Sequence, residues 1–148
     1  ESFIHEKSFQ LNGQTIPLTL TYKERATTTN LFSWNHTSPK YFPQIKQRLN
    51  QLLGEYHKLS GSNVEDVVNH VAEMHYLMAN ATFYKRGSAG ISDMVAKSLL
   101  EAKGIQLSPY KSGIMPDCEA FVRDLDDYKK AYANFFEKEP HKMVQLNG

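Results

Sequence analysis

The sequence predicts an α+β fold that is mainly α, with an N-terminal β-hairpin packed on a bundle of about four helices. Apolar and polar residues alternate on both sides of Asn12-Gly13, and apolar residues recur at helical spacing from residue 45 to residue 136. The chain has 148 residues, of which 41% are hydrophobic and 22% are charged. A chain of this size and composition is expected to form one domain with a single core, here residues 1–148.

The hairpin is the first predicted element. Alternation runs from Phe9 to Leu11 and again from Ile16 to Tyr22, with Asn12-Gly13 between the two runs. Asn-Gly favours this arrangement because both central positions of a two-residue hairpin turn need positive φ. Pro17 cannot donate to a strand ladder, so its N–H side should face an edge.

A loop and a helix are predicted next. Residues 23–38 are rich in Thr, Asn and Ser, so we expect a long loop that Phe32 and Trp34 pin to the domain. A helix is then expected to begin at Ser38-Pro39 or at Pro43 and to continue to residue 59. Gly54 weakens this helix by about 1 kcal/mol and is expected to mark a close contact.

Two helices are predicted at the centre of the domain, over residues 63–83 and 90–103. Ser62 and Glu65 form a capping box at the start of the first, and Gly104 follows the end of the second. A last helix should begin at Asp117 and break near Asp124. Its aromatic residues recur at helical spacing, which indicates core or a partner surface: Tyr128, Tyr132, Phe135 and Phe136.

Charge and missing motifs limit the classes of function. The formal net charge is +1, so no overall field favours nucleic acid. No apolar run approaches the roughly 20 residues that span a bilayer. The motifs of nucleotide-binding loops, dinucleotide folds and zinc fingers are absent, so no cofactor is expected. Cys118 is the only cysteine, so no intrachain disulfide can form.

The candidate site is the connection that joins the two central helices, which contains Lys85-Arg86-Gly87-Ser88. A helix N-terminus beside two basic side chains favours an anion. Gly87 allows a ligand close to the backbone, and Ser88 can donate to a phosphate or cap the helix. The pattern therefore indicates either a site for a phosphate-bearing ligand or a tight turn with solvated basic residues.

His75 lies on the apolar face of the helix before this connection. It is either a core histidine with a satisfied ring, or a catalytic base or orienting residue beneath the turn. A metal site with His70 is not expected, because residues five apart on a helix lie about 140° apart around its axis.

The helix, glycine-containing turn and helix resemble the Fic/Doc family, which transfers nucleotide-derived groups to proteins. Ala81-Thr82-Phe83 stands where that family has His-Pro-Phe, and Gly87-Ser88 stands one residue after its Gly-Asn. Phe83 and Gly87 agree with the motif. Alanine replaces the family's catalytic histidine at position 81, and Lys85 or Arg86 replaces its metal-binding acid.

The resemblance implies a degenerate Fic-like domain of a bacterial effector or toxin that is secreted into the host cytoplasm. Its partner would be a phosphate-bearing small molecule or a host protein. An enzyme of this kind would be a transferase acting on protein, but the residues for that reaction are missing. The alternative is a non-enzymatic interaction domain of a larger bacterial protein, which binds through the hairpin edge or the aromatic last helix. The oligomeric state is not predicted.

Overall fold

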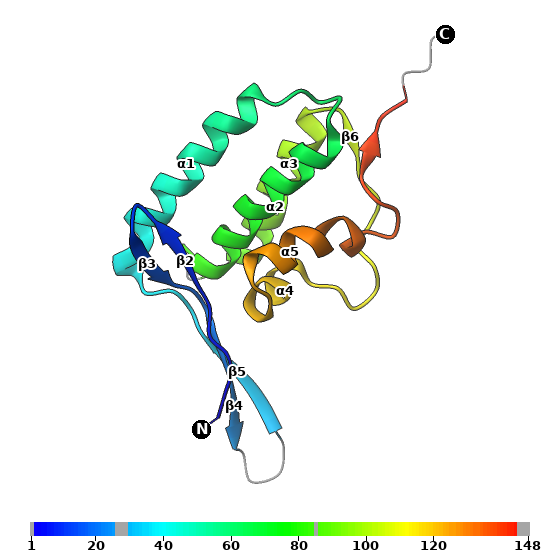
Figure 1. Ribbon diagram of the computed structural model, residues 1–148. Coiled ribbons are helices and arrows are strands. Elements are labelled where there is room, and N and C mark those ends of the chain that lie inside the picture. Colours follow the sequence, from blue (N-terminus) through cyan, green and yellow to red (C-terminus); the bar gives the residue numbers. More distant parts are fainter. Residues whose placement is uncertain (1, 26–29, 85, 145–148) are drawn as a thin grey trace.

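The computed structural model describes residues 2–25, 30–84 and 86–144 (Figure 1). Strands come first and are followed by five α-helices in this part of the chain, so the predicted mainly helical α+β class is confirmed. Figure 1 shows the strands below and beside the helices, with one sheet projecting away from them.

The predicted hairpin is formed by β2 (Ser8–Leu11) and β3 (Gln14–Pro17). Its turn residues have positive φ, 50° at Asn12 and 77° at Gly13, as the sequence predicts. The alternating run from Ile16 to Tyr22 does not form one strand, however. β3 ends at Pro17, and Leu18 donates its N–H to the Lys7 carbonyl outside the hairpin.

A second sheet contains β1 (Ser2–His5), β4 (Leu20–Arg25) and β5 (Asn30–Asn35), in the antiparallel order β1-β4-β5. The predicted loop over residues 23–38 is therefore wrong, because β4 and β5 occupy much of it. Trp34 pairs with Thr21, and Phe32 pairs with Lys23. Phe32 is 58% exposed, so it does not pin a loop to the core.

The helices follow a 3₁₀ turn at Pro39–Tyr41. The α-helices are α1 (Phe42–Lys58), α2 (Val64–Ala81), α3 (Ser88–Ala102), α4 (Pro116–Val122) and α5 (Leu125–Tyr132). A second 3₁₀ turn, Ala133–Phe135, and a short ladder of β6 (Ile105–Gln106) with β7 (His141–Lys142) complete the fold. The predicted break of the last helix near Asp124 is confirmed.

Three local predictions about the helices are wrong. Asn63 caps α2 in place of Ser62, and it accepts a hydrogen bond from the Asp66 amide. α4 begins at Pro116 after Met115, so Asp117 lies inside the first turn and is not its cap. A Cβ added at Gly54 would meet no atom within 4 Å, so this glycine marks no close contact.

α2 is the centre of the helical layer. It contacts α1, α3, α4 and α5, and most of its residues are buried (Figure 1). A helix that is buried on nearly all sides needs an apolar surface all round, and α2 supplies one with residues such as Val67, Val71 and Leu77. α3 buries only Ser92, Ala96 and Leu100, so α2 alone holds the central position that the sequence predicts for the pair.

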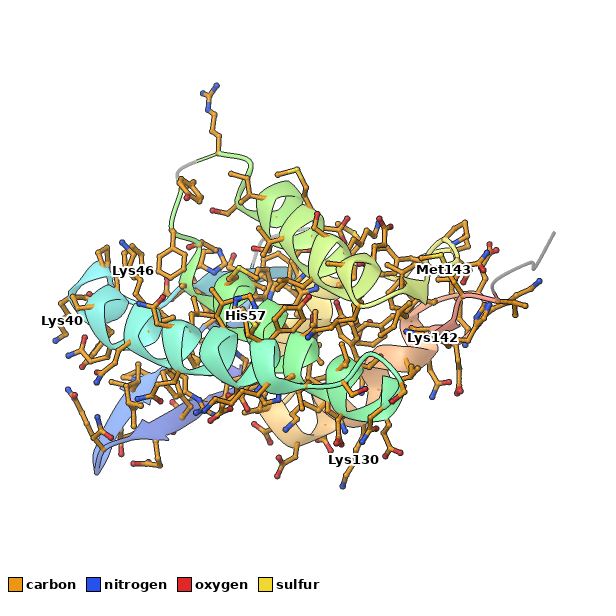
Figure 2. All side chains as sticks on the ribbon, turned by 90° about the horizontal axis from the view of Figure 1, so that it is seen from above. Lys40, Lys46, His57, Lys130, Lys142 and Met143 are labelled. Atoms are coloured by element: carbon orange, nitrogen blue, oxygen red, sulfur yellow. The ribbon has the colours of Figure 1, made fainter. Side chains whose placement is uncertain are left out.

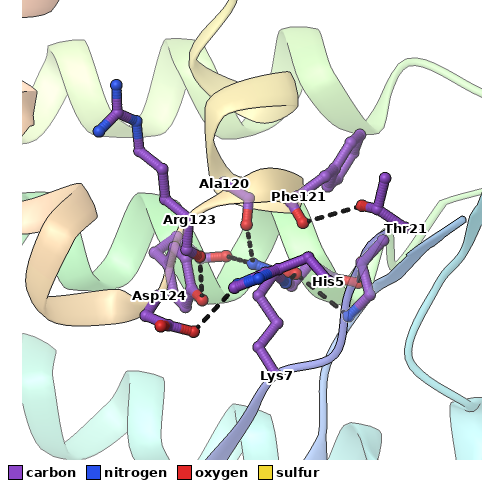
Figure 3. A network of polar contacts seen from close by, with 10 residues as sticks. His5, Lys7, Thr21, Ala120, Phe121, Arg123 and Asp124 are labelled. Carbon is purple, nitrogen blue, oxygen red and sulfur yellow. Dashed lines mark hydrogen bonds and ion pairs between the residues drawn. The ribbon is translucent and has the colours of Figure 1, made fainter. Parts of the chain in front are cut away.

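Asn80, near the end of α2, joins the strands to the helices. Figure 3 shows the polar network around it, with Lys7 on the strand side and Ala120 on the helix side. Its side-chain oxygen accepts hydrogen bonds from the Lys7 ammonium and the Thr19 amide. Its side-chain nitrogen donates to the carbonyls of Tyr76 and Ala120. The side chain is fully buried, so each of these bonds replaces one that water would otherwise make.

Gly61, between α1 and α2, lies against the end of α3. A Cβ there would lie 2.4 Å from the Lys103 carbonyl oxygen and 3.0 Å from the Lys142 ammonium. Lys142 donates to that same carbonyl, and Lys103 donates to the carbonyl of Leu59. Three connections of the chain therefore meet at one tight corner that has no room for a side chain at position 61.

Candidate functional site at the start of α3

The α2–α3 turn, residues 82–87, is shaped by two residues with positive φ. Thr82 ends α2 with φ 47°, and Gly87 precedes α3 with φ 78°. The Ser88 hydroxyl accepts from the Tyr84 amide at 2.9 Å and donates to the Tyr84 carbonyl at 2.8 Å. This hydroxyl therefore closes the turn on itself. Lys85 lies outside the described residues, so its predicted role stays a prediction.

The start of α3 is open to solvent. Arg86 and Gly87 are exposed, and a Cβ added at Gly87 would meet no atom within 4 Å. The first turn of α3 contains no acidic residue. The first N–H groups of a helix have no partner within it and carry a partial positive charge. The turn thus combines accessible backbone donors with one described cationic side chain.

His75 is 1% exposed on α2. Its Nδ1 lies 2.7 Å from the Tyr132 hydroxyl of α5, and its ring meets the rings of Tyr128 and Tyr132 edge-on. Burial lowers the pKa of His75 to about 4. The imidazole is therefore neutral at neutral pH and held by a hydrogen bond; a catalytic role for it stays a prediction.

One cavity brings His75 and the start of α3 together. It has a volume of about 270 Å³ and is lined by His75 and by Ala89 and Gly90 of α3. Asp93 and Tyr110 lie on its wall. Hereafter it is called the His75 cavity. Ser88 instead lines a second cavity on the other side of α3, together with Tyr84.

Asp93 and Tyr110 are functional candidates that the sequence did not reveal. The Tyr110 hydroxyl donates to the Asp93 carboxylate, which also forms a 3.0 Å ion pair with Lys97. The Lys97 ammonium lies 4.4 Å from the centre of the Tyr110 ring. Burial, with Tyr132 and Asp93 nearby, raises the pKa of Tyr110. No motif marks these residues, because the fold alone brings Tyr110 to Asp93 of α3, 17 positions earlier in the chain.

Metal binding by the histidines of α2 has no support from their partners. His70 lies 2.9 Å from Glu55 of α1, whereas His75 bonds to Tyr132 of α5, so the two rings have different neighbours. Within residues 2–25, 30–84 and 86–144, no three His, Cys, Asp or Glu side chains gather as a metal site would require. In the same ranges, no helix has both the length and the apolar character to cross a membrane.

A model of the avirulence protein family AvrB/AvrC matches residues 9–139. The chain belongs to this family. It is also 28% identical over 107 residues to avirulence protein B of Pseudomonas savastanoi pv. glycinea, a match that covers 71% of this chain and 32% of that relative. The chain therefore spans about a third of the length of the relative. Membership places the chain in a family of bacterial effectors, as the sequence predicts.

The resemblance to Fic/Doc proteins is wrong. The match to the AvrB/AvrC model extends over residues 9–139, whereas the Fic/Doc resemblance rested on Phe83 and Gly87 at motif positions. Glycine in the turn that follows a helix is a common feature of helix–turn–helix connections. Two such positions could not identify the family.

Proposed function

We propose that this chain is an effector domain that acts inside host cells and binds a phosphate-bearing ligand at the α2–α3 turn. The open backbone at Gly87 is the observation that supports this most directly: a Cβ added there would meet no atom within 4 Å, and the neighbouring Arg86 is exposed. With no acidic residue in the first turn, the helix dipole and the guanidinium attract an anion together.

The residues of the turn would contact the phosphate in different ways. Arg86 holds two phosphate oxygens with its planar fork, and Gly87 lets the phosphate approach the backbone. Ser88 contributes its main-chain N–H, since its hydroxyl already bonds to Tyr84. Lys85 adds a second positive charge by its place in the sequence.

The remainder of the ligand would lie in the His75 cavity, which begins at Ala89 and Gly90. His75 borders this cavity, and the Tyr132 hydroxyl holds its ring at 2.7 Å, so His75 acts there as a positioning residue beneath the turn. Transfer of part of the ligand to a host protein is the reaction that such an effector could perform.

Binding is tested by thermal unfolding of the chain at low salt with inorganic phosphate, sulfate, ATP, GTP, UTP or ADP-ribose. A ligand present at 100 times its Kd should stabilise the fold by about 2.7 kcal/mol. Arg86→Ala should abolish the shift, because it removes the charged contact to phosphate. Lys58→Ala removes one exposed positive charge at the end of α1 and should leave the shift unchanged.

The absence of a shift with every one of these compounds would contradict the proposal. If Arg86→Ala and Lys58→Ala reduced the ligand-induced stabilisation equally, net charge, and not the turn, would govern binding.

A second function, protein interaction, is favoured by the projecting sheet. Phe32 and Trp34 of β5 are 58% and 38% exposed, and β5 is an outer strand of its sheet. Such an edge can accept a strand from a partner. The aromatic last helix does not supply the expected surface, since Tyr128 and Tyr132 are fully buried. Two results together would favour this function. The chain would bind a host protein without any added ligand, with weaker binding in Trp34→Ala, and no nucleotide would shift the thermal unfolding of the chain.

A further inference from the structure

A second cavity, of about 330 Å³, lies between α1, the end of α2 and the first turns of α3; we call it the α1–α3 cavity. Its walls are apolar side chains from all three helices: Phe42 and Leu49 of α1, Met78 of α2, and Ile91 and Val95 of α3. This volume falls at the lower end of the range for small-molecule sites.

The rim of this cavity is aromatic and carries an ammonium group. Phe83 meets Phe42 edge-on with 4.9 Å between ring centres, and Tyr84 beside it is 56% exposed. The Lys46 ammonium lies 5.5 Å from the centre of the Phe83 ring. Figure 2 places Lys46 on α1 at the end that faces the α2–α3 turn.

The charge of the cavity is of one sign. Among the described residues that line it, Lys46 is the charged one, and none is acidic. The two serine hydroxyl groups in the wall already donate within the protein, Ser88 to the Tyr84 carbonyl and Ser92 to the Ser88 carbonyl. Tyr84 adds a phenolic hydroxyl at the rim. An occupant therefore meets apolar walls and one positive charge at the rim.

We propose that the α1–α3 cavity binds a small amphipathic anion, an aromatic carboxylate or sulfonate, with its ring between the helices and its anionic group beside Lys46. The apolar walls favour burial of the ring, and the lysine complements the charge. This site is distinct from the phosphate site at Arg86, because its walls are side chains between α1 and α3, and Arg86 and Gly87 are not among the residues that line it, although Ser88 borders both.

The test uses anilinonaphthalene sulfonate as the anionic probe and N-phenyl-1-naphthylamine, the same aromatic frame without the sulfonate, as the neutral one. Fluorescence titration should give saturable binding of both. Lys46→Gln should weaken the sulfonate by about threefold to tenfold and leave the neutral probe unchanged. Lys40→Gln is the matched control, since Lys40 lies near Lys46 but stacks on Tyr41 outside the cavity (Figure 2).

Methionine methyl resonances locate the probe without any substitution. Met78 lines the cavity and Met94, on α3, is 62% exposed outside it. The aromatic probe should shift the Met78 methyl resonance and leave that of Met94 in place. A shift of the Met94 resonance alone would overturn the proposal. Equal losses of affinity for the sulfonate probe in Lys46→Gln and Lys40→Gln would overturn it as well. Displacement of the probe by phosphate would also overturn it, because the two sites would then be one.

Discussion

Lys7 holds an ammonium group where little water reaches it. The residue is 9% exposed, its Nζ donates to Asn80, and it lies 5.3 Å from the centre of the Tyr76 ring. Burial lowers the pKa of Lys7 to about 7, and the negative charge of Asp124 opposes this only in part. Burial lowers the pKa of His36, and the positive charge of Lys7 lowers it further.

Lys7 should make the stability of the fold depend on pH. Its pKa is about 7 in the fold and 10.5 in the unfolded chain, so the unfolded chain binds the proton more tightly. The full cost of burying the charge is present below pH 7, and it falls as the pH rises from 7 to 10.5. This residue should therefore add a slope of up to about 1.4 kcal/mol per pH unit to the unfolding free energy.

Urea unfolding between pH 6 and 9.5 measures this slope. Lys7→Met should remove most of the rise in stability that the wild type shows above pH 7, whereas Lys58→Met, at an exposed site, should keep it. The same pH dependence in Lys7→Met and wild type would contradict the assignment of the proton to Lys7.

The beginning of α2 shows how two neighbouring caps compete. The sequence predicts Ser62 with Glu65 as the capping box, whereas the structure uses Asn63, whose side chain accepts from the Asp66 amide. In the fold the Ser62 hydroxyl lies 2.7 Å from the Ser60 hydroxyl, and Asn63 bonds to Asp66 through both its oxygen and its nitrogen. Serine and asparagine are almost equally good caps, so the type of residue does not decide between them, and here the Ser62 hydroxyl bonds to Ser60 instead of to the helix.

Replacement of each residue by alanine should show which of the two caps the helix. Asn63→Ala should lower the unfolding free energy by about 1 kcal/mol, because the Asp66 amide loses its acceptor. Ser62→Ala should cost less than about half of that, since it removes only a bond between exposed hydroxyls. Urea unfolding of both variants gives the comparison, and a larger loss in Ser62→Ala would reverse it.

Local signals predicted elements well, whereas pairing between distant segments could not be read from the sequence. Asn12-Gly13 forms a turn and Gly104 follows the end of a helix, because these residues readily adopt positive φ. β5 was missed because its strand character depends on pairing with β4. The candidate turn was likewise a local feature. His75 and Tyr132 are 57 positions apart, so the periodicity of a single helix cannot predict their contact.

The strands and the helical layer are joined by polar contacts around the buried Asn80, in addition to apolar packing. Thr21 of β4 donates to the Phe121 carbonyl of α4, and Tyr76 of α2 donates to the Arg123 carbonyl after α4. His5 of β1 lies 3.1 Å from the Asp124 carboxylate. Such bonds are directional, so they fix how the projecting sheet is oriented on the helices.

Asn80→Ala should loosen this junction. The Lys7 ammonium, the Thr19 amide and the Ala120 carbonyl each lose a buried partner, for a total cost of about 3 kcal/mol. Hydrogen exchange should accelerate first in the amides of β4, while those of α3 change less. Asn69→Ala on the same helix is the control. Uniform acceleration through all helices would show that Asn80 supports the whole core and not this junction.

The corner at Gly61 determines where the chain can accept a reporter group. A label attached at Gly54 would project into open space from α1, and replacing that glycine would also favour the helix. The same label at position 61 would collide with the Lys103 carbonyl and push apart the connections that meet there. For spectroscopy, a label at position 54 should therefore leave the native arrangement undisturbed. A label at position 61 should instead displace α1 and α2 from the end of α3.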